Sequence, residues 1–300
     1  MSFVSPFYLV FLPLVVLCFY RVPHRARWGV LLAASAYAYL SWNPWLLLLL
    51  LAMITVTYLA ARAMPRASTA ARRRLLLGIC LFFCLGSLLF FKYAAFLTDN
   101  LFALLRLAKP SLTAPELNIL LPVGISFYTF QTLSYVLDVY RGTIPPERHF
   151  GYYALFVIYF PQLVAGPIER PQDLLPQLKK AQTFSADNLR QGLAYLISGY
   201  FRKCVAADYF GVFVDRVYGS PDTANALAIA VAALLFMGQI YNDFAGYSEI
   251  AIGTARLMGI RLTRNFDRPL SSGSIREFMR RWHICYGITV QVSANYFYIV

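Results

Sequence analysis

Residues 45–61 read WLLLLLLAMITVTYLAA, and none of them carries a charge. A helix needs roughly 20 apolar residues to cross the hydrocarbon core of a bilayer, so such a run is typical of a transmembrane span. The pair Asn43-Pro44 precedes it and favours a turn. Because residues 28–42 form another apolar run before that turn, the stretch predicts a membrane hairpin.

Composition extends this interpretation to the whole chain. Of 300 residues, 59% are hydrophobic and 14% are charged, whereas a soluble domain carries about 25% charged residues. Further apolar runs cover residues 3–20, 75–91, 94–107, 117–140, 150–165, 189–213 and 224–258, the last long enough for a span plus an interfacial piece. We predict a single all-α membrane domain over residues 1–300, a polytopic transmembrane bundle of about eight to ten embedded helices with interfacial amphipathic helices.

The net charge of +13 does not indicate nucleic-acid binding, because the basic residues lie in short loops between apolar runs. Arg21, Arg25 and Arg27 form one cluster, and Arg62, Arg66 and residues 72–74 form another. Such clusters mark cytoplasmic loops, which places the N-terminus outside. The first apolar run lacks the basic start and small-residue cleavage site of a signal peptide, so we interpret it as a retained span.

The cysteines and histidines give no metal-ligand pattern. Cys80 and Cys84 share one face of an apolar helix, where cysteine packs as a small polarizable side chain. None of the three histidines stands in ligand spacing with a cysteine. We predict no bound metal.

Polar side chains inside apolar runs are informative, since burying them in lipid costs several kcal/mol unless they are paired. Tyr128, Gln131, Tyr135 and Asp138 follow one another at helical spacing and form a polar stripe on one face. This stripe is compatible with a substrate path and equally with hydrogen bonds that hold helices together.

A second polar cluster, residues 241–249, ends an apolar run and contains Asp243, Ser248 and Glu249. The two carboxylates are predicted to lie at the membrane interface or to face a polar cavity. Functional and architectural roles are both open for this cluster.

The segment 274–284 predicts an interfacial helix. Ser274 and Glu277 fit a capping box, so the helix should begin at Ser274. Apolar and basic residues then alternate at helical spacing, as in amphipathic helices that lie on a membrane. His283 projects at the seam of the two faces, where an imidazole has the proton affinity of a general base near neutral pH.

Six motifs together resemble the membrane-bound O-acyltransferases, and among them the bacterial branch that acetylates exopolysaccharides such as alginate. In chain order they are LPVGISFYTFQ (121–131), DVYRG (138–142), FPQLVAGPIER (160–170), DFAGYS (243–248), NFDRP (265–269) and EFMRRWHI (277–284). They recur in the family's order over roughly residues 1–284. The last places His283 at the first of two family histidines.

The resemblance implies an O-acyltransferase of the bacterial cytoplasmic (inner) membrane that holds no cofactor. Its substrate is an activated acyl donor, in the first instance acetyl-CoA from the cytoplasmic side, and the acceptor is a polysaccharide hydroxyl. It also implies a periplasmic acyltransferase partner, contact with membrane lipid, and a tunnel lined by Tyr128, Gln131, Asp138, Asp243, Ser248, Glu249 and Asn265. A tunnel of this kind keeps water from the activated acyl group.

Residues 285–300 depart from the family pattern, and the family's second histidine, within a Trp-His-Gly motif, does not occur. We therefore expect a truncated or frame-shifted product that does not acylate by itself. Two other classes stay open. A non-catalytic membrane subunit of a polysaccharide secretion system accounts for the missing histidine. A transporter would show paired internal repeats, and the sequence has no clear repeat.

Overall fold

The computed structural model describes residues 3–287 except 43, 110, 111, 114, 116, 118, 164, 165, 221 and 223. Most of the divergent segment 285–300, and residues 164 and 165 of the third motif, therefore lie outside the described residues. Every regular element among the described residues is helical, which confirms the all-α fold class for this part of the chain.

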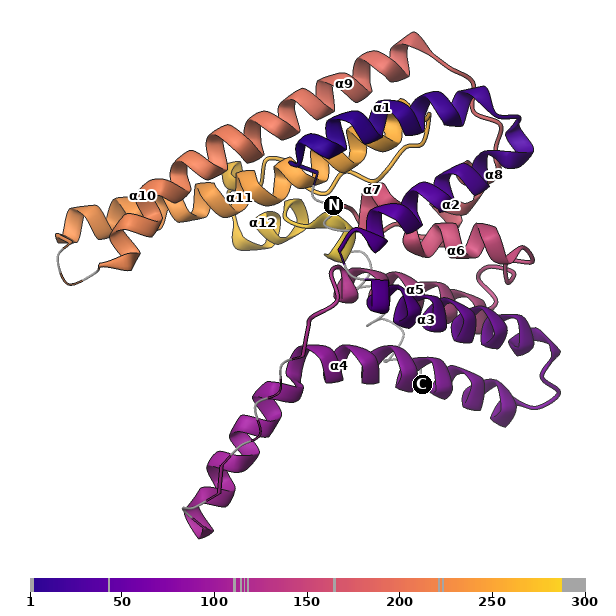
Figure 1. Ribbon diagram of the computed structural model, residues 1–300, viewed down its shortest axis with the longest axis horizontal. Coiled ribbons are helices and arrows are strands. Elements are labelled where there is room, and N and C mark those ends of the chain that lie inside the picture. Colours follow the sequence, from indigo (N-terminus) through magenta and orange to yellow (C-terminus); the bar gives the residue numbers. More distant parts are fainter. Residues whose placement is uncertain are drawn as a thin grey trace.

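Figure 1 shows the arrangement of these helices. They are α1 (Pro6–Arg21), α2 (His24–Leu40), α3 (Pro44–Ala63), α4 (Ala70–Ala108), α5 (Ile125–Arg141), α6 (Phe150–Ile158), α7 (Phe160–Leu163), α8 (Pro171–Lys179), α9 (Ala186–Tyr200), α10 (Asp208–Gly219), α11 (Ala226–Leu257) and α12 (Ile275–Arg281), with the short η1 (Met64–Arg66) and η4 (Pro269–Ser271) and the π-helix η2 (Phe201–Ala207).

Three of the described helices are long and apolar enough to cross a membrane: Pro44–Arg66, Ala70–Leu107 and Ala226–Leu257. Large apolar side chains on their surfaces are exposed, such as Leu48, Phe82 and Leu234. A lipid environment accounts for these exposed side chains, since a soluble protein rarely shows contiguous apolar surface of this extent. The expected total of eight to ten embedded helices includes shorter segments and stays a prediction.

Several predicted boundaries were wrong. The runs 75–91 and 94–107 form one helix, α4, whose second half extends away from the other helices (Figure 1). The run 224–258 is a single helix of 32 residues, α11, and its division into a span and an interfacial piece stays a prediction. The run 189–213 continues from α9 through the π-helix η2 into α10.

The predicted run 150–165 is broken at Tyr159, whose non-helical backbone (φ −51°, ψ 110°) separates α6 from α7. In a continuous helix, the N–H of Phe160 would donate to the carbonyl of Phe156. Here Phe160 N–H donates to Ser35 Oγ at 3.0 Å. The Phe156 carbonyl instead accepts from the amides of Gln131 (2.6 Å) and Gln162 (2.8 Å). Such a break is stable at membrane depth only because neighbouring helices satisfy the freed backbone groups.

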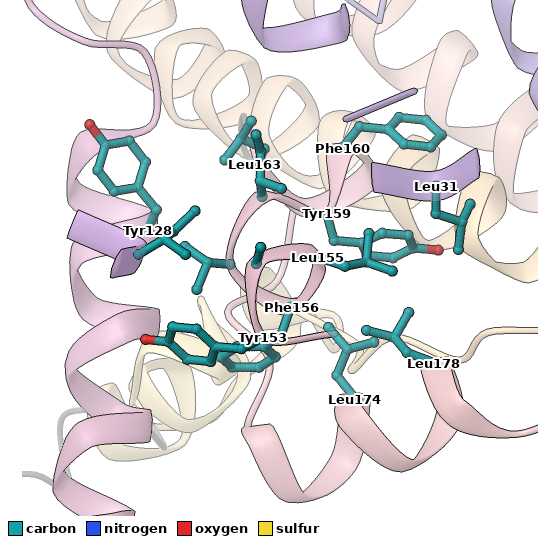
Figure 2. Close-up of a cluster of buried hydrophobic side chains, with 14 of the residues drawn as sticks. Leu31, Tyr128, Tyr153, Leu155, Phe156, Tyr159, Phe160, Leu163, Leu174 and Leu178 are labelled. Carbon is teal, nitrogen blue, oxygen red and sulfur yellow. The ribbon is translucent and has the colours of Figure 1, made fainter. Parts of the chain in front are cut away.

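The core of the described part surrounds this broken segment. Figure 2 shows Tyr153, Phe156 and Tyr159 between Tyr128 of α5 and Leu174 of α8. All five side chains are at most 1% exposed. The core thus fixes α5, α6 and α8 relative to one another.

A second unit consists of α9 and α11, which make the most extensive helix–helix contact of the described residues. Gly199 lies against the backbone of Gly246, and Gly192 lies against that of Gly253. In each pair, a Cβ on either glycine would come within 2.7–3.1 Å of the carbonyl oxygen of its partner. Small residues at matching positions allow close backbone approach, as is common in membrane helix pairs.

Candidate active site

Helix α12 begins as predicted, because Ser274 Oγ accepts a hydrogen bond from Glu277 N–H at 3.2 Å. The helix ends at Arg281, however, and His283 follows it with a left-handed backbone (φ 48°). The expectation that His283 projects from the seam of a helix was therefore wrong. Ile275 and Met279 of α12 are exposed, as expected for a helix whose apolar residues contact lipid.

The segment around His283 pairs with residues 265–267 instead of continuing the helix. Ile284 N–H donates to the carbonyl of Asn265 at 2.9 Å, and Asp267 N–H donates to the carbonyl of Arg281 at 3.0 Å. A continuous helix would use both the Ile284 N–H and the Arg281 carbonyl internally. These two hydrogen bonds explain why the helix stops and the chain turns at His283.

Three aromatic rings surround the imidazole of His283. Its ring centroid lies 4.8 Å from that of Phe244 on α11, 5.2 Å from Tyr286 and 6.3 Å from Phe127 on α5. The imidazole therefore lies where α5, α11 and the 281–287 segment meet.

This environment controls the protonation of His283. Burial lowers its pKa from 6.5 to about 4, because the charged imidazolium loses its hydration. The Nε2 atom is shielded from solvent and has no hydrogen-bond partner among the described residues. At neutral pH the ring is therefore a neutral imidazole.

Ser248, Glu249 and Asn265 lie together at a cavity of about 30 Å³, which is enough for one or two waters. Asn265 is buried and its Nδ2 donates to Ser248 Oγ at 3.1 Å. The Oδ1 atom of Asn265 has no partner among the described residues. Asn265 links this cavity to the His283 segment, because its side chain lines the cavity and its backbone carbonyl accepts the Ile284 N–H.

The two carboxylates of the 241–249 cluster form ion pairs with η2. Asp243 pairs with Lys203, and Glu249 pairs with Arg202 at 3.1 Å. Ser198 Oγ also donates to Glu249 at 2.6 Å. These bonds connect α11 to α9 and η2, so both carboxylates contribute to helix packing.

The polar stripe of α5 faces another direction. Tyr128, Gln131, Tyr135 and Asp138 are all buried, and Gln131 and Tyr135 bond to the α6 carbonyl at Phe156 and to Glu147 N–H. Asp138 experiences the charges of Arg170 and Arg141. By contrast, Phe127 and Phe130 of α5 contact His283 and Tyr286. The structure therefore does not bring the stripe together with His283.

Residues 148–287 match the family model for membrane-bound O-acyltransferases. The chain belongs to the membrane-bound O-acyltransferase family. The matched segment contains His283, Asn265, Ser248, Glu249 and Asp243, whereas the α5 stripe precedes it.

Curated relatives support the same family over most of this chain. A probable alginate O-acetylase of Azotobacter vinelandii is 38% identical over 283 residues, which are 93% of this chain and 55% of the relative. A probable alginate O-acetylase of Pseudomonas aeruginosa is 37% identical over 285 residues, with 93% and 53% covered. A peptidoglycan O-acetyltransferase of Helicobacter pylori is 32% identical, with 93% and 58% covered. The chain thus spans little more than half the length of these relatives.

One buried residue of the family segment was missed as a site residue. Glu169 follows α7, is 1% exposed, and accepts hydrogen bonds from the backbone N–H and the Oγ1 of Thr263. Burial raises the pKa of its carboxyl from 4.5 to about 7 against the lowering effect of these bonds. Because Thr263 lies two residues before Asn265, Glu169 positions the extended segment whose Asn265 carbonyl accepts the Ile284 N–H. The sequence did offer a signal for Glu169, namely a carboxylate shortly after the apolar run 150–165.

Among the described residues, no group of three or more His, Cys, Asp or Glu is arranged to hold a metal ion. The cysteine pair of α4, Cys80 and Cys84, is buried in the core.

Proposed function

We propose that this protein transfers an acyl group from an activated donor to a hydroxyl of a polysaccharide, and that His283 takes part in the reaction. One observation carries the proposal: a neutral imidazole with an unpartnered Nε2 lies between α5 and α11 inside the family segment. Alginate O-acetylases and a peptidoglycan O-acetyltransferase among the relatives support an acetyl group and a polysaccharide acceptor.

In the proposed step, the acceptor hydroxyl oxygen forms a bond to the acyl carbonyl carbon and the carbon–sulfur bond of a thioester donor breaks. The hydroxyl proton goes to Nε2 of His283 and then to the departing thiolate, so an ester and a thiol are formed. A hydroxyl is a weak nucleophile until a base takes its proton. A pKa near 4 leaves His283 unprotonated at neutral pH, so its lone pair is available for that proton, although the imidazole is then a weaker base than one whose pKa lies near the working pH.

The surroundings of His283 support this role. Phe244 and Tyr286 pack against the ring, and its Nε2 atom is shielded from solvent. Exclusion of water protects an activated acyl group from hydrolysis. We assign Asn265, Ser248 and Glu249 to the polar wall beside this site, because they line the cavity that adjoins it.

We further propose that acetyl-CoA is the donor, presented from the cytoplasmic side of the bacterial inner membrane. A periplasmic acyltransferase is the proposed partner that completes transfer to the secreted polymer. Gln131 and Asp243 are assigned to support of the bundle, since their bonds run between helices. Tyr128 and Asp138 are assigned to the same role, because both side chains are buried in the helix packing.

The test expresses the natural gene over its whole reading frame, in an alginate-producing strain that lacks its own O-acetylase, so it does not depend on the expectation that residues 1–300 do not acylate by themselves. We expect acetyl esters on the polymer with the unmodified gene and with His24→Gln, a control histidine on α2 outside the site. His283→Gln at equal membrane abundance should reduce the esters to the vector level. Absence of esters with the unmodified, well-expressed gene would contradict the proposed function.

A further inference from the structure

The turn that joins α3 to α4 contains a basic cavity of about 460 Å³. Three arginines from consecutive elements line it: Arg62 from α3, Arg66 from η1 and Arg72 from α4. The rest of the lining is the ring of Tyr58 and small or apolar side chains, including Leu59 and Leu76.

The charge of this cavity is uncompensated within the described part of the chain, where none of the three arginines pairs with a carboxylate. Arg62 is held in place, since its Nη1 donates to Tyr58 Oη at 3.2 Å and to the carbonyl of Arg148 at 3.0 Å. Arg66 and Arg72 are exposed. One fixed and two adjustable guanidinium groups suit a phosphate, which accepts several charge-assisted hydrogen bonds at once.

The position of the cavity favours a lipid over a soluble anion. This turn joins two of the three described helices that are long enough to span a membrane, Pro44–Arg66 and Ala70–Leu107. The cavity therefore lies where the chain leaves the hydrocarbon core, at the level of the phospholipid headgroups. Leu59, at its edge, is 59% exposed. A soluble phosphate would contact only the basic end, whereas a phospholipid would also cover this apolar wall.

We propose that this cavity binds an anionic phospholipid, with the phosphate among Arg62, Arg66 and Arg72 and an acyl chain along Leu59 and Leu76. Basic pockets between transmembrane helices bind anionic headgroups in this manner. The inference does not depend on acyl transfer, so its failure would leave the proposed function unaffected.

The test is native mass spectrometry of the full protein in detergent, titrated with phosphatidylglycerol or phosphatidylcholine. The double variant Arg66→Gln/Arg72→Gln removes two charges whose side chains make no hydrogen bond or ion pair in the described structure. Arg74→Gln is the matched control, because Arg74 is exposed on the same helix start but does not line the cavity. We expect about thirty-fold weaker phosphatidylglycerol binding in the double variant, from roughly fivefold per arginine.

Unchanged phosphatidylglycerol affinity in Arg74→Gln and weak phosphatidylcholine binding to the unmodified protein would support a specific site. A loss of about fivefold in Arg74→Gln, the same per arginine as in the double variant, would overturn it, since diffuse positive charge would then explain the binding. Displacement of phosphatidylglycerol by millimolar inorganic phosphate would also overturn it, because the ligand would then be a soluble anion. The comparison of the three ligands on the unmodified protein needs no variant to fold.

Discussion

The backbone N–H of Ile284 donates a hydrogen bond to the carbonyl oxygen of Asn265 at 2.9 Å. This bond holds the residue after His283 to the segment 263–265. That segment is itself fixed by the buried Asn265 side chain and by Glu169, which binds Thr263. The position of the imidazole therefore depends on residues from the α7–α8 connection and from α11.

Asn265→Ala should reduce the free energy of unfolding by about 1–3 kcal/mol, because Ser248 Oγ loses a donor inside the buried cluster. Thermal unfolding in detergent measures the loss. Arg264→Gln is the control, since its pair with Asp267 is exposed and contributes less than about 1 kcal/mol. Equal effects of the two substitutions would show that the Asn265 side chain is not a structural anchor.

Gly246→Ala should lower the yield of folded protein, because the new Cβ would lie 2.8 Å from the carbonyl oxygen of Gly199 and 2.9 Å from Lys203 N. Gly78→Ala, in the N-terminal part of α4, has open space around its Cβ and should be neutral or stabilise by about 0.5–1 kcal/mol. Size-exclusion chromatography of solubilised membranes compares the two. Normal yield of Gly246→Ala would contradict the close packing of α9 on α11.

Glu169 predicts a pH dependence of stability. Its folded-state pKa of about 7 lies above the ordinary 4.5, so the folded protein holds a proton that the unfolded chain releases. The contribution of Glu169 to the free energy of unfolding is therefore full below about pH 4.5. It falls as the pH rises to about 7, by on the order of 3 kcal/mol. The depressed pKa of His283 acts in the opposite direction, with stability lost as the pH falls from 6.5 to about 4.

Glu169→Gln separates the two titrations. A glutamine amide can accept from Thr263 N–H and donate to Thr263 Oγ1, which reproduces the protonated acid without a charge. We expect this variant to match the wild type at pH 5 and to be more stable at pH 8, as measured by thermal unfolding in detergent. Parallel stability curves for the two proteins would rule out a raised pKa at Glu169.

The topology prediction rests on the basic loop that joins α3 to α4. Ser68 is exposed in this loop, so a Ser68→Cys variant should react with an impermeant maleimide only after the cells are broken. The five native cysteines require a background labelling control with the unmodified protein. Labelling of the variant in intact cells would place the loop outside and reverse the predicted orientation.

Apolar runs and capping residues predicted the positions of several helices correctly. The runs 3–20, 28–42 and 45–61 correspond to α1, α2 and α3, and the capping pair Ser274 and Glu277 marks the start of α12. Lys92 lies between the two predicted runs 75–91 and 94–107, yet one charged residue does not end the helix, and both runs belong to α4.

Features set by tertiary hydrogen bonds escaped sequence analysis. The break at Tyr159 exists because Ser35, far earlier in the chain, accepts the Phe160 N–H. The turn at His283 exists because residues 265–267 replace the helical partners of Arg281 and Ile284. No local pattern carries such information, so the predicted helical projection of His283 was wrong, while its role in the site stays a proposal.

The central claim is that His283 acts as a neutral proton acceptor, and the pH profile of kcat/KM for acetyl transfer tests it most directly. The measurement uses membranes containing the Glu169→Gln variant, which removes the second titration. A burial-lowered pKa of about 4 predicts a constant kcat/KM from pH 8 down to about pH 5, and His283→Gln in this background should be slower by about 10²–10⁴-fold. A decline centred near pH 6.5, or a His283→Gln rate within threefold of its parent, would contradict the account.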